Sequence, residues 1–346
     1  MQSGEARVSL ATFSLAHDKG EAVLTFSPNI HSSTPGAMGL YFGAEPSPGY
    51  RLRRVRGRGG FAEVWEAESP SGPPVALKFM PSSNATTTAR ELRSIQSFLA
   101  LDHPNLVKTH DVWSVPGYIV INMELAEATL LDLMLVYHND LCQQIDPPLL
   151  CLYLWQVSEA LDFLNARRHL RDGRKIGIQH GDVKPNNILL FGDVVKLTDH
   201  GLATPTHGPT TPCSRQGTRE YAAPEVFVGH LSDTSDQFSL AVTYYVLRTG
   251  RFPFPPPPVP LPKSYIRPPV DLSGVTEAEQ PALMRAMAPV PQDRFPTCRD
   301  LMTALLKAHG LKANRQEDGS WKVVREESSE PAASSQSRSS FRLHRK

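Results

Sequence analysis

The chain has 346 residues, of which 40% are hydrophobic and 21% are charged, and its formal net charge is +1. This composition is typical of a globular protein with one large two-lobed domain or two ordinary ones. A charge so near zero gives no electrostatic basis for binding nucleic acid. The four cysteines lack metal-ligand spacing, and no apolar run reaches the roughly 18 residues of a membrane span. We therefore expect a reduced, cytoplasmic protein with no membrane span.

Residues 1–47 are rich in Ser, Gly and Pro and show no sustained hydrophobic periodicity. Such a composition predicts a poorly ordered N-terminal extension. Within it, the stretch EAVLTF over residues 21–26 has the pattern of a short strand.

From residue 50 the sequence alternates strands with turns. YRLRRVRGRGGFAEVWEAESPSGPPVALKFM has the pattern of three strands, separated by a glycine turn and by a turn of Ser, Pro and Gly. In TTTARELRSIQSFLAL the apolar residues recur at helical spacing and the threonines suit a helix start, which predicts an amphipathic helix. GYIVINMEL predicts a further strand.

Helices dominate from residue 130 onward. LLCLYLWQVSEALDFLNARRHL predicts a long, mostly buried helix, and SDQFSLAVTYYVLRTG predicts another that ends at Gly250. Residues 311–346 are so polar and Ser-rich that we expect a disordered tail. Strands followed by helices predict an α+β fold over 48–310, with a small antiparallel β-rich lobe at about 48–125 and a larger, mostly helical lobe at about 126–310.

The stretch GRGGFAEV, from Gly57 to Val64, has the composition of a phosphate-binding loop. Gly57 and Gly59 let the backbone approach a phosphate without Cβ collisions, and successive N–H groups can then face the anion. Ala62 stands where a third glycine often occurs and is small enough to keep that approach open. By itself the pattern fits a simple hairpin turn equally well.

Lys78 lies in the stretch VALK, which has the pattern of a strand among apolar neighbours. A lysine is costly to bury there unless an anion meets it, although a lysine at a sheet edge can also extend into solvent. Glu91, on the predicted amphipathic helix, is the natural partner for this lysine.

The loop HGDVKPNNILL contains Asp182, Lys184 and Asn187, whose side chains suit phosphoryl transfer. Asp182 can orient a substrate hydroxyl and accept its proton, and Lys184 can neutralise charge on the transferred phosphoryl group. Asn187 offers an amide oxygen to a hard cation such as magnesium, and Asp199, after the strand VVKLT, offers a second oxygen. Each piece alone fits an ordinary polar turn, but the ordered set fits that reading poorly.

With these motifs in order, the sequence resembles a serine/threonine protein kinase, especially a bacterial one, across about residues 50–310. The resemblance implies a bilobal kinase fold, ATP and Mg²⁺ as cofactors, protein substrates with Ser or Thr hydroxyls, and autophosphorylation of the chain itself. It implies catalytic roles for Asp182, Lys184, Lys78 and Glu91, and metal ligation by Asn187 and Asp199. The residues that it implies for nucleotide binding are Gly57, Gly59, Ala62, Val64, Ala76, Lys78, Met123, Glu124, Ala126 and Leu189.

The resemblance also covers the segment that follows the second metal ligand. GTREYAAPE is similar to the end of a kinase activation loop and places Thr218 near the substrate hydroxyl. Glu225 is expected to pair with Arg294, and Asp236 is expected to brace the catalytic loop through backbone N–H groups.

Two positions depart from the family pattern. Gly181 replaces the arginine of His-Arg-Asp, which normally binds a phosphorylated activation-loop residue, so we expect activity without activation-loop phosphorylation. His200 replaces the phenylalanine of Asp-Phe-Gly. A neutral histidine can fill that space, whereas a protonated one loses solvation, and simple structural tolerance is the favoured interpretation.

The stretch FPFPPPPVPLP predicts extended polyproline conformation. A stiff loop between helices of the large lobe is the favoured interpretation, and a docking segment for an SH3-like partner is the alternative.

Two other functions fit parts of the pattern. Gly181 and His200 are compatible with a pseudokinase scaffold that binds nucleotide or partners without catalysis, but retention of Lys78, Asp182 and Asp199 argues against it. HGD followed by an asparagine also resembles the catalytic loop of aminoglycoside-type small-molecule phosphotransferases, whereas GTREYAAPE belongs to protein kinases.

Overall fold

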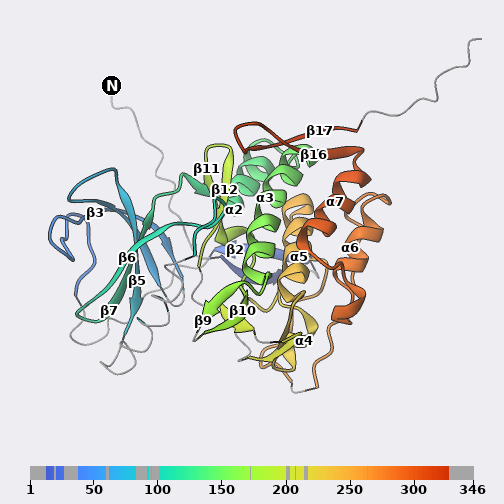
Figure 1. Ribbon diagram of the computed structural model, residues 1–346, viewed down its shortest axis with the longest axis horizontal. Helices are drawn as coiled ribbons and strands as arrows, with labels where there is room; N and C mark the ends of the chain where they lie inside the picture. The colour runs from blue at the N-terminus through green and yellow to red at the C-terminus, as the bar shows by residue number, and fades with distance from the viewer. Residues whose placement is uncertain are drawn as a thin grey trace, which may run out of the picture.

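The computed structural model describes residues 13–18, 21–26, 38–59, 62–82, 92, 95, 101–171, 173–199, 203–206, 208–213, 217–262 and 264–326. A strand-rich lobe lies on the left of Figure 1 and a larger helical lobe lies on the right, joined after strand β7 (Tyr118–Glu124). The predicted α+β bilobal fold is therefore confirmed. Within the described ranges, no helix is both long enough and apolar enough to cross a membrane.

The small lobe is built on one five-stranded antiparallel sheet in the order β3-β4-β5-β7-β6. Its other strands are β3 (Arg51–Arg58), β4 (Glu63–Glu68), β5 (Val75–Pro81) and β6 (Thr109–Val115). Alternation along β5 sends Leu77 and Phe79 into one apolar cluster and Ala76 into another, on the opposite face. Lys78 shares the face of Ala76 by the same alternation.

The predicted amphipathic helix is described at two positions only. Leu92 and Ile95 are helical, are half-buried, and pack against the apolar cluster that contains Ala76. The rest of that prediction, including Glu91, lies outside the described residues.

The large lobe is mainly helical. Its helices are α2 (Leu130–Leu135), the π-helical η1 (Val136–Asp140), α3 (Pro147–Asn165), the 3-10 turn η2 (Pro185–Asn187), α4 (Pro224–Phe227), α5 (Ser235–Thr249), α6 (Gln280–Ala286), the 3-10 turn η4 (Pro291–Asp293) and α7 (Cys298–Ala308). Its short strands are β8 (Ala128–Thr129), β9 (His169–Arg171), β10 (Arg174–Gln179), β11 (Ile188–Phe191), β12 (Val194–Leu197), β13 (Thr204–Thr206), β14 (Thr210–Pro212) and β15 (His230–Ser232).

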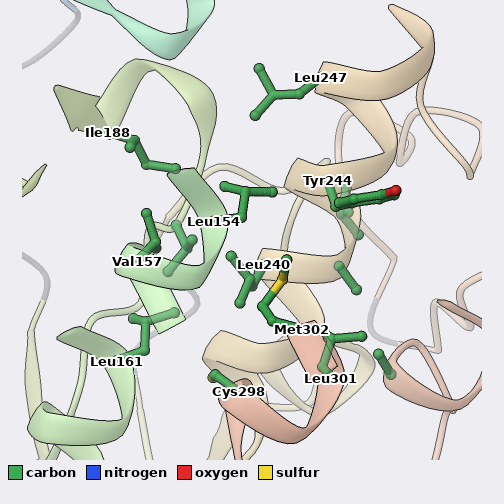
Figure 2. Packing of buried hydrophobic residues seen from close by; sticks show 14 of the residues in the cluster. Leu154, Val157, Leu161, Ile188, Leu240, Tyr244, Leu247, Cys298, Leu301 and Met302 are labelled. Carbon is green, nitrogen blue, oxygen red and sulfur yellow. The ribbon is translucent and has the colours of Figure 1, made fainter. Parts of the chain in front are cut away.

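The predicted long helices, α3 and α5, form the centre of the large lobe. Prolines suit the first turn of α3 because the N–H groups there have no intrahelical partner, and Gly250 ends α5 with a φ of +71°. Figure 2 shows the side chains that fill the space between α3, α5 and α7, among them Leu154, Val157, Leu161, Leu240, Tyr244, Leu247, Leu301 and Met302. This packing anchors α5, whose Asp236 hydrogen-bonds the loop that carries Asp182.

A buried carboxylate joins three helices at the far side of this core. Glu279 lies just before α6 and accepts a hydrogen bond from the Tyr244 hydroxyl of α5 at 2.7 Å. Its second oxygen accepts hydrogen bonds from the backbone and hydroxyl of Thr276, at 2.9 and 2.8 Å. His309, at the end of α7, lies 2.9 Å from the Tyr244 hydroxyl. The carboxylate of Glu279 thus joins α5 to the start of α6 and, through Tyr244, to the end of α7.

The C-terminal tail prediction is wrong for its first residues. Residues 311–325 form an antiparallel hairpin of β16 (Leu311–Arg315) and β17 (Trp321–Arg325). The hairpin lies beside α3 (Figure 1). Trp321 packs edge-on against Trp155 of α3 at 5.1 Å, and its indole nitrogen donates to Glu159 at 3.1 Å. The Ser-rich composition belongs to residues 327–346, which lie outside the described residues, and it masked the alternating pattern before them.

The N-terminal extension is also more regular than predicted. EAVLTF is strand β2 (Glu21–Phe26), paired antiparallel with β1 (Phe13–Asp18). Nearer the sheet, Ala44 is buried in the first apolar cluster. Its carbonyl accepts the Leu52 N–H at 2.9 Å, and the Gly43 N–H donates to the Leu52 carbonyl at 2.7 Å. Residues 38–47 therefore belong to the small lobe because they cover one face of its sheet.

Candidate functional site

The site begins with the loop between β10 and β11, which α5 holds in place. The Asp236 carboxylate of α5 accepts the backbone N–H groups of His180 at 2.6 Å and of Gly181 at 2.9 Å. Burial raises the pKa of Asp236, and these hydrogen bonds and His180 oppose that rise. Gly181 has a φ of +78°, a conformation that costs glycine least. The predicted bracing contact is therefore present.

Asp182 is the centre of a compact polar cluster. Its carboxylate lies 2.8 Å from Lys184 Nζ and accepts the Thr218 hydroxyl at 2.7 Å and the Thr218 N–H at 3.0 Å. Lys184 Nζ also donates to the Thr218 hydroxyl at 2.6 Å. Asn187 donates from its amide nitrogen to the Asp182 carbonyl at 2.8 Å and carboxylate at 2.9 Å. An acid, a cation and a hydroxyl are thus in mutual contact.

The charge of Asp182 is fixed by these partners. Burial opposes ionisation, but Lys184 and Thr218 outweigh it and lower the pKa of Asp182 below its usual range. At neutral pH the group is therefore a carboxylate, which can accept a proton from a hydroxyl placed where that of Thr218 lies.

Lys78 and Asp199 meet across the two lobes. Lys78 lies on β5, and Asp199 follows β12. The Lys78 Nζ is 2.6 Å from a carboxylate oxygen of Asp199. Burial disfavours the Asp199 charge, yet Lys78 reverses this and lowers its pKa to about 2. Asp199 also has a φ of +71°, which is uncommon outside glycine and is seen where surroundings enforce it, as at functional sites.

The Asp199 and Asp182 clusters are neighbours. The backbone N–H of Thr198 donates to the Asn187 carbonyl at 2.9 Å, which brings the chain before Asp199 alongside the loop of Asp182. Lys184 also contributes to lowering the pKa of Asp199. The structure therefore brings together the predicted polar set of Lys78, Asp182, Lys184, Asn187 and Asp199.

The side chains predicted to bind adenine lie together in one apolar cluster. Ala76 and Met123 are buried in one apolar cluster, against which Val64 and Leu189 pack. Val64 and Ala76 come from the small-lobe sheet and Leu189 comes from β11 of the large lobe, so the cluster spans both lobes.

The glycine-rich turn and the link between the lobes flank this cluster. Gly57 lies in β3, and the N–H of Gly59 donates to the Ala62 carbonyl at 2.8 Å. A Cβ added at Gly57 would meet nothing within 4 Å, so the backbone is open to approach there. Glu124 ends β7, and its carboxylate forms an ion pair with Lys196 at 2.7 Å.

The segment after Thr218 is anchored to the large lobe by an ion pair between Glu225 and Arg294. The Glu225 carboxylate accepts two hydrogen bonds from Arg294, both at 2.8 Å, as the sequence predicted. Burial opposes ionisation of Glu225, but Arg294 lowers its pKa below the usual range. Residues 214–216 and His200 lie outside the described residues. The expectation that His200 fills the place of the family's phenylalanine therefore stays a prediction.

Sequence reasoning missed Arg56, which crosses from the small lobe to the segment between the lobes. Arg56 Nη2 donates to the Ala126 carbonyl at 2.9 Å and the Glu127 carbonyl at 2.5 Å. Its other terminal nitrogen lies 3.6 Å from Glu66 on β4. Its place in the sequence, directly before Gly57, was the available signal, because a residue there must lie beside the mouth of the site.

Comparison with known proteins agrees with this geometry. The family model for the protein kinase domain matches residues 50–310. The serine/threonine-protein kinase PknE of Mycobacterium tuberculosis is 32% identical over 289 residues, which cover 80% of this chain and 48% of PknE. PknH of the same species is 32% identical over 304 residues, covering 82% of this chain and 45% of PknH.

A third relative, the serine/threonine-protein kinase PknF of M. tuberculosis, is 31% identical over 275 residues, covering 74% of this chain and 56% of PknF. The chain thus spans about half the length of the curated relatives it matches. The match to the family model covers both lobes and every described residue of the polar cluster. The chain belongs to the protein kinase family.

Proposed function

We propose that the chain is a serine/threonine protein kinase that transfers the γ-phosphoryl group of ATP to Ser and Thr hydroxyls of protein substrates. The observation that carries this proposal is the contact of Asp182 with both Lys184 and the Thr218 hydroxyl, beside the Lys78–Asp199 pair. The relatives named above are serine/threonine kinases, which supports the same residue class.

The residues present divide the work of transfer among them. Asp182, ionised at neutral pH, accepts the proton of an incoming hydroxyl, which takes the place that the Thr218 hydroxyl now has. Lys184, within 2.8 Å of Asp182, places a positive charge where negative charge develops on the phosphoryl group. Asp236 fixes the loop, so little reorganisation is needed at the moment of transfer.

ATP and a divalent cation are general to the protein kinase family, and we propose magnesium as the cation. Asn187 donates both amide hydrogens to Asp182, which leaves its amide oxygen for a cation. Asp199 stays ionised at neutral pH, so it supplies a carboxylate oxygen. These oxygens fit a hard cation, which neutralises phosphate charge when bound. Lys78 is proposed to hold the nucleotide phosphates, with Glu91 as its second partner.

A transfer assay tests the proposal directly. The purified chain is incubated with MgATP and a generic protein substrate, and the products are mapped by mass spectrometry. Phosphate on Ser or Thr of the substrate, or of the chain itself, is the expected result. Nucleotide binding without transfer would instead identify a pseudokinase scaffold. Transfer confined to an aminoglycoside would identify a small-molecule phosphotransferase.

We further propose that transfer does not require a phosphorylated activation loop. Gly181 has no side chain to bind a phosphate on the activation loop. The loop that carries Asp182 is instead held by Asp236, which accepts the Gly181 N–H. Phosphatase treatment is therefore expected to leave the transfer rate unchanged, as measured with a peptide substrate. Alanine at Thr204, Thr206, Thr210, Thr211 and Ser214 should do the same. Loss of activity in both experiments would refute this independence.

Removal of the Arg56 guanidinium is expected to weaken nucleotide binding. An Arg56→Met variant loses both donor bonds to the segment between the lobes, so Ala126 and Glu127 become less ordered beside the adenine cluster. Because the group is partly exposed, we expect an increase in Kd of about fivefold, which corresponds to about 1 kcal/mol. Titration with a fluorescent ATP analogue measures it. Arg54→Met, on the same strand but 65% exposed, is the matched control, and equal Kd values for the two variants would contradict the prediction.

A further inference from the structure

The Pro-rich segment between α5 and α6 packs beneath the segment that follows Thr218. Phe252 stacks edge-on against Tyr221 at 5.3 Å, and Phe254 stacks on Phe238 of α5 at 5.7 Å. Phe254 is buried, whereas Val259 further along is largely exposed. The first part of FPFPPPPVPLP is therefore a packed element of the large lobe, as the favoured interpretation of the sequence expected.

Arg267, which follows this Pro-rich stretch in the same loop, is buried without a carboxylate partner among the described residues. It is only 8% exposed. Its guanidinium carbon lies 4.6 Å from the ring centre of Phe254, 5.0 Å from that of Phe227 and 5.6 Å from that of Phe238. Its Nε and Nη1 are buried with no hydrogen-bond acceptor in the described part of the chain. Burial lowers the pKa of this arginine to about 10.

A buried cation without an anion is unfavourable, so its contacts must offset that cost. Aromatic faces attract a guanidinium through their quadrupoles, and three rings surround this one. The remaining nitrogen, Nη2, donates to the carbonyls of Arg219 and Ala222, each at 2.7 Å. The only hydrogen bonds of the Arg267 guanidinium within the described residues thus go to two backbone carbonyls of one short segment.

Those carbonyls belong to the stretch that begins beside the proposed proton acceptor. Thr218 contacts Asp182, and Arg219 to Ala222 follow it directly. Within this stretch the Tyr221 carbonyl accepts the Ser239 hydroxyl at 3.0 Å. The large lobe therefore holds three carbonyls of residues 219–222 through hydrogen bonds. Because this stretch follows Thr218 directly, it lies next to the position that a substrate hydroxyl takes at Asp182 under the proposed function.

We propose that Arg267 is a positioning residue for the protein substrate, which holds residues 219–222 in the conformation that receives the chain flanking the phosphoacceptor. This inference rests on the proposed kinase function. Arginine suits the role better than lysine, because its planar guanidinium can stack between rings while one nitrogen bridges two carbonyls. Lysine carries the charge but lacks the planar group.

Kinetics of variants in the full chain test the proposal. In Arg267→Met an unbranched apolar side chain replaces the guanidinium and leaves no donor, and we expect the KM for a protein substrate to rise about tenfold. The KM for ATP is expected to stay the same, because Arg267 contacts no residue of the nucleotide cluster. Arg267→Lys should recover part of the lost affinity. Arg251→Met, an exposed arginine at the start of the same loop, is the control and should match the original chain.

Hydrogen exchange gives a second readout that does not depend on activity. The amides of residues 219–223 are expected to exchange faster in Arg267→Met than in Arg251→Met. If the Met variant fails to fold by circular dichroism, the same comparison is made with Arg267→Lys. Unchanged exchange, an unchanged substrate KM, or a fall in kcat alone would overturn the proposal. A chain that transfers no phosphate would refute the kinase function, while the exchange experiment would still decide whether Arg267 holds this stretch.

Discussion

Replacement of Asp182 by asparagine is expected to lower the rate of phosphoryl transfer by about 10²–10⁴-fold, the range that a general base contributes. Asparagine has almost the same shape, and its amide oxygen can still accept the Thr218 N–H and hydroxyl. It cannot take a proton, and it leaves Lys184 without its anionic partner. The loss should therefore appear in kcat, measured with labelled ATP and a peptide substrate.

Nucleotide affinity separates loss of chemistry from loss of structure in this experiment. The Asp182→Asn chain should bind an ATP analogue as tightly as the original, since Lys78 and the adenine cluster are untouched. Asp193→Asn, in the exposed turn between β11 and β12, provides a control with the same chemical change. A variant at position 182 that retains full kcat would show that Asp182 does not accept the substrate proton.

Replacement of Glu279 by glutamine is expected to lower the free energy of unfolding by about 2–3 kcal/mol at pH 7. Glu279 is fully buried and accepts hydrogen bonds from Tyr244 and Thr276, with Arg248 Nε at 3.6 Å. Burial disfavours its charge, but hydrogen bonds from His309 and Tyr244 outweigh burial and lower its pKa from 4.5 to about 2. At about 1.4 kcal/mol per pH unit, this difference sets an upper limit of about 3.5 kcal/mol.

The pH dependence of this effect has a definite sign. A carboxyl whose pKa is lowered in the folded state stabilises the fold fully above the unfolded pKa, here about 4.5. That contribution is lost as the pH falls from about 4.5 towards 2. Urea unfolding of Glu279→Gln and the original chain should therefore differ most at pH 7 and converge as the pH falls towards 2. Exposed Glu277→Gln is the control and should change stability by less than about 0.5 kcal/mol. A constant difference at all pH values would contradict the prediction.

The sequence was sufficient to predict the polar centre because phosphoryl transfer requires particular side chains in a fixed order. Asp182, Lys184 and Asn187 lie within one short loop, and a strand and turn return the chain to Asp199 beside them. Local patterns also predicted α3 and α5, since both helices are long and mostly buried. In each case the signal lies within a few consecutive residues.

The residues that could not be predicted act through contacts between distant segments. Arg56 meets carbonyls 70 and 71 residues away, and the carbonyls that Arg267 holds are 45 and 48 residues away. Backbone carbonyls occur at every residue, so no sequence pattern marks which of them an arginine will bind. Composition alone also mispredicted residues 311–325, because the hairpin buries Leu311 and packs Trp321 and Val323 against the core, contacts that a polar average obscures.

That hairpin has a consequence for the way the protein unfolds. The family match ends at residue 310, yet Trp321 packs on α3, which also packs against α5 and α7. Arg299 of α7 adds a salt bridge to Glu159 at 3.1 Å, next to the tryptophan. We therefore expect the cooperative unit of this chain to extend past the end of the family match, so that loss of β16 and β17 coincides with melting of the large lobe.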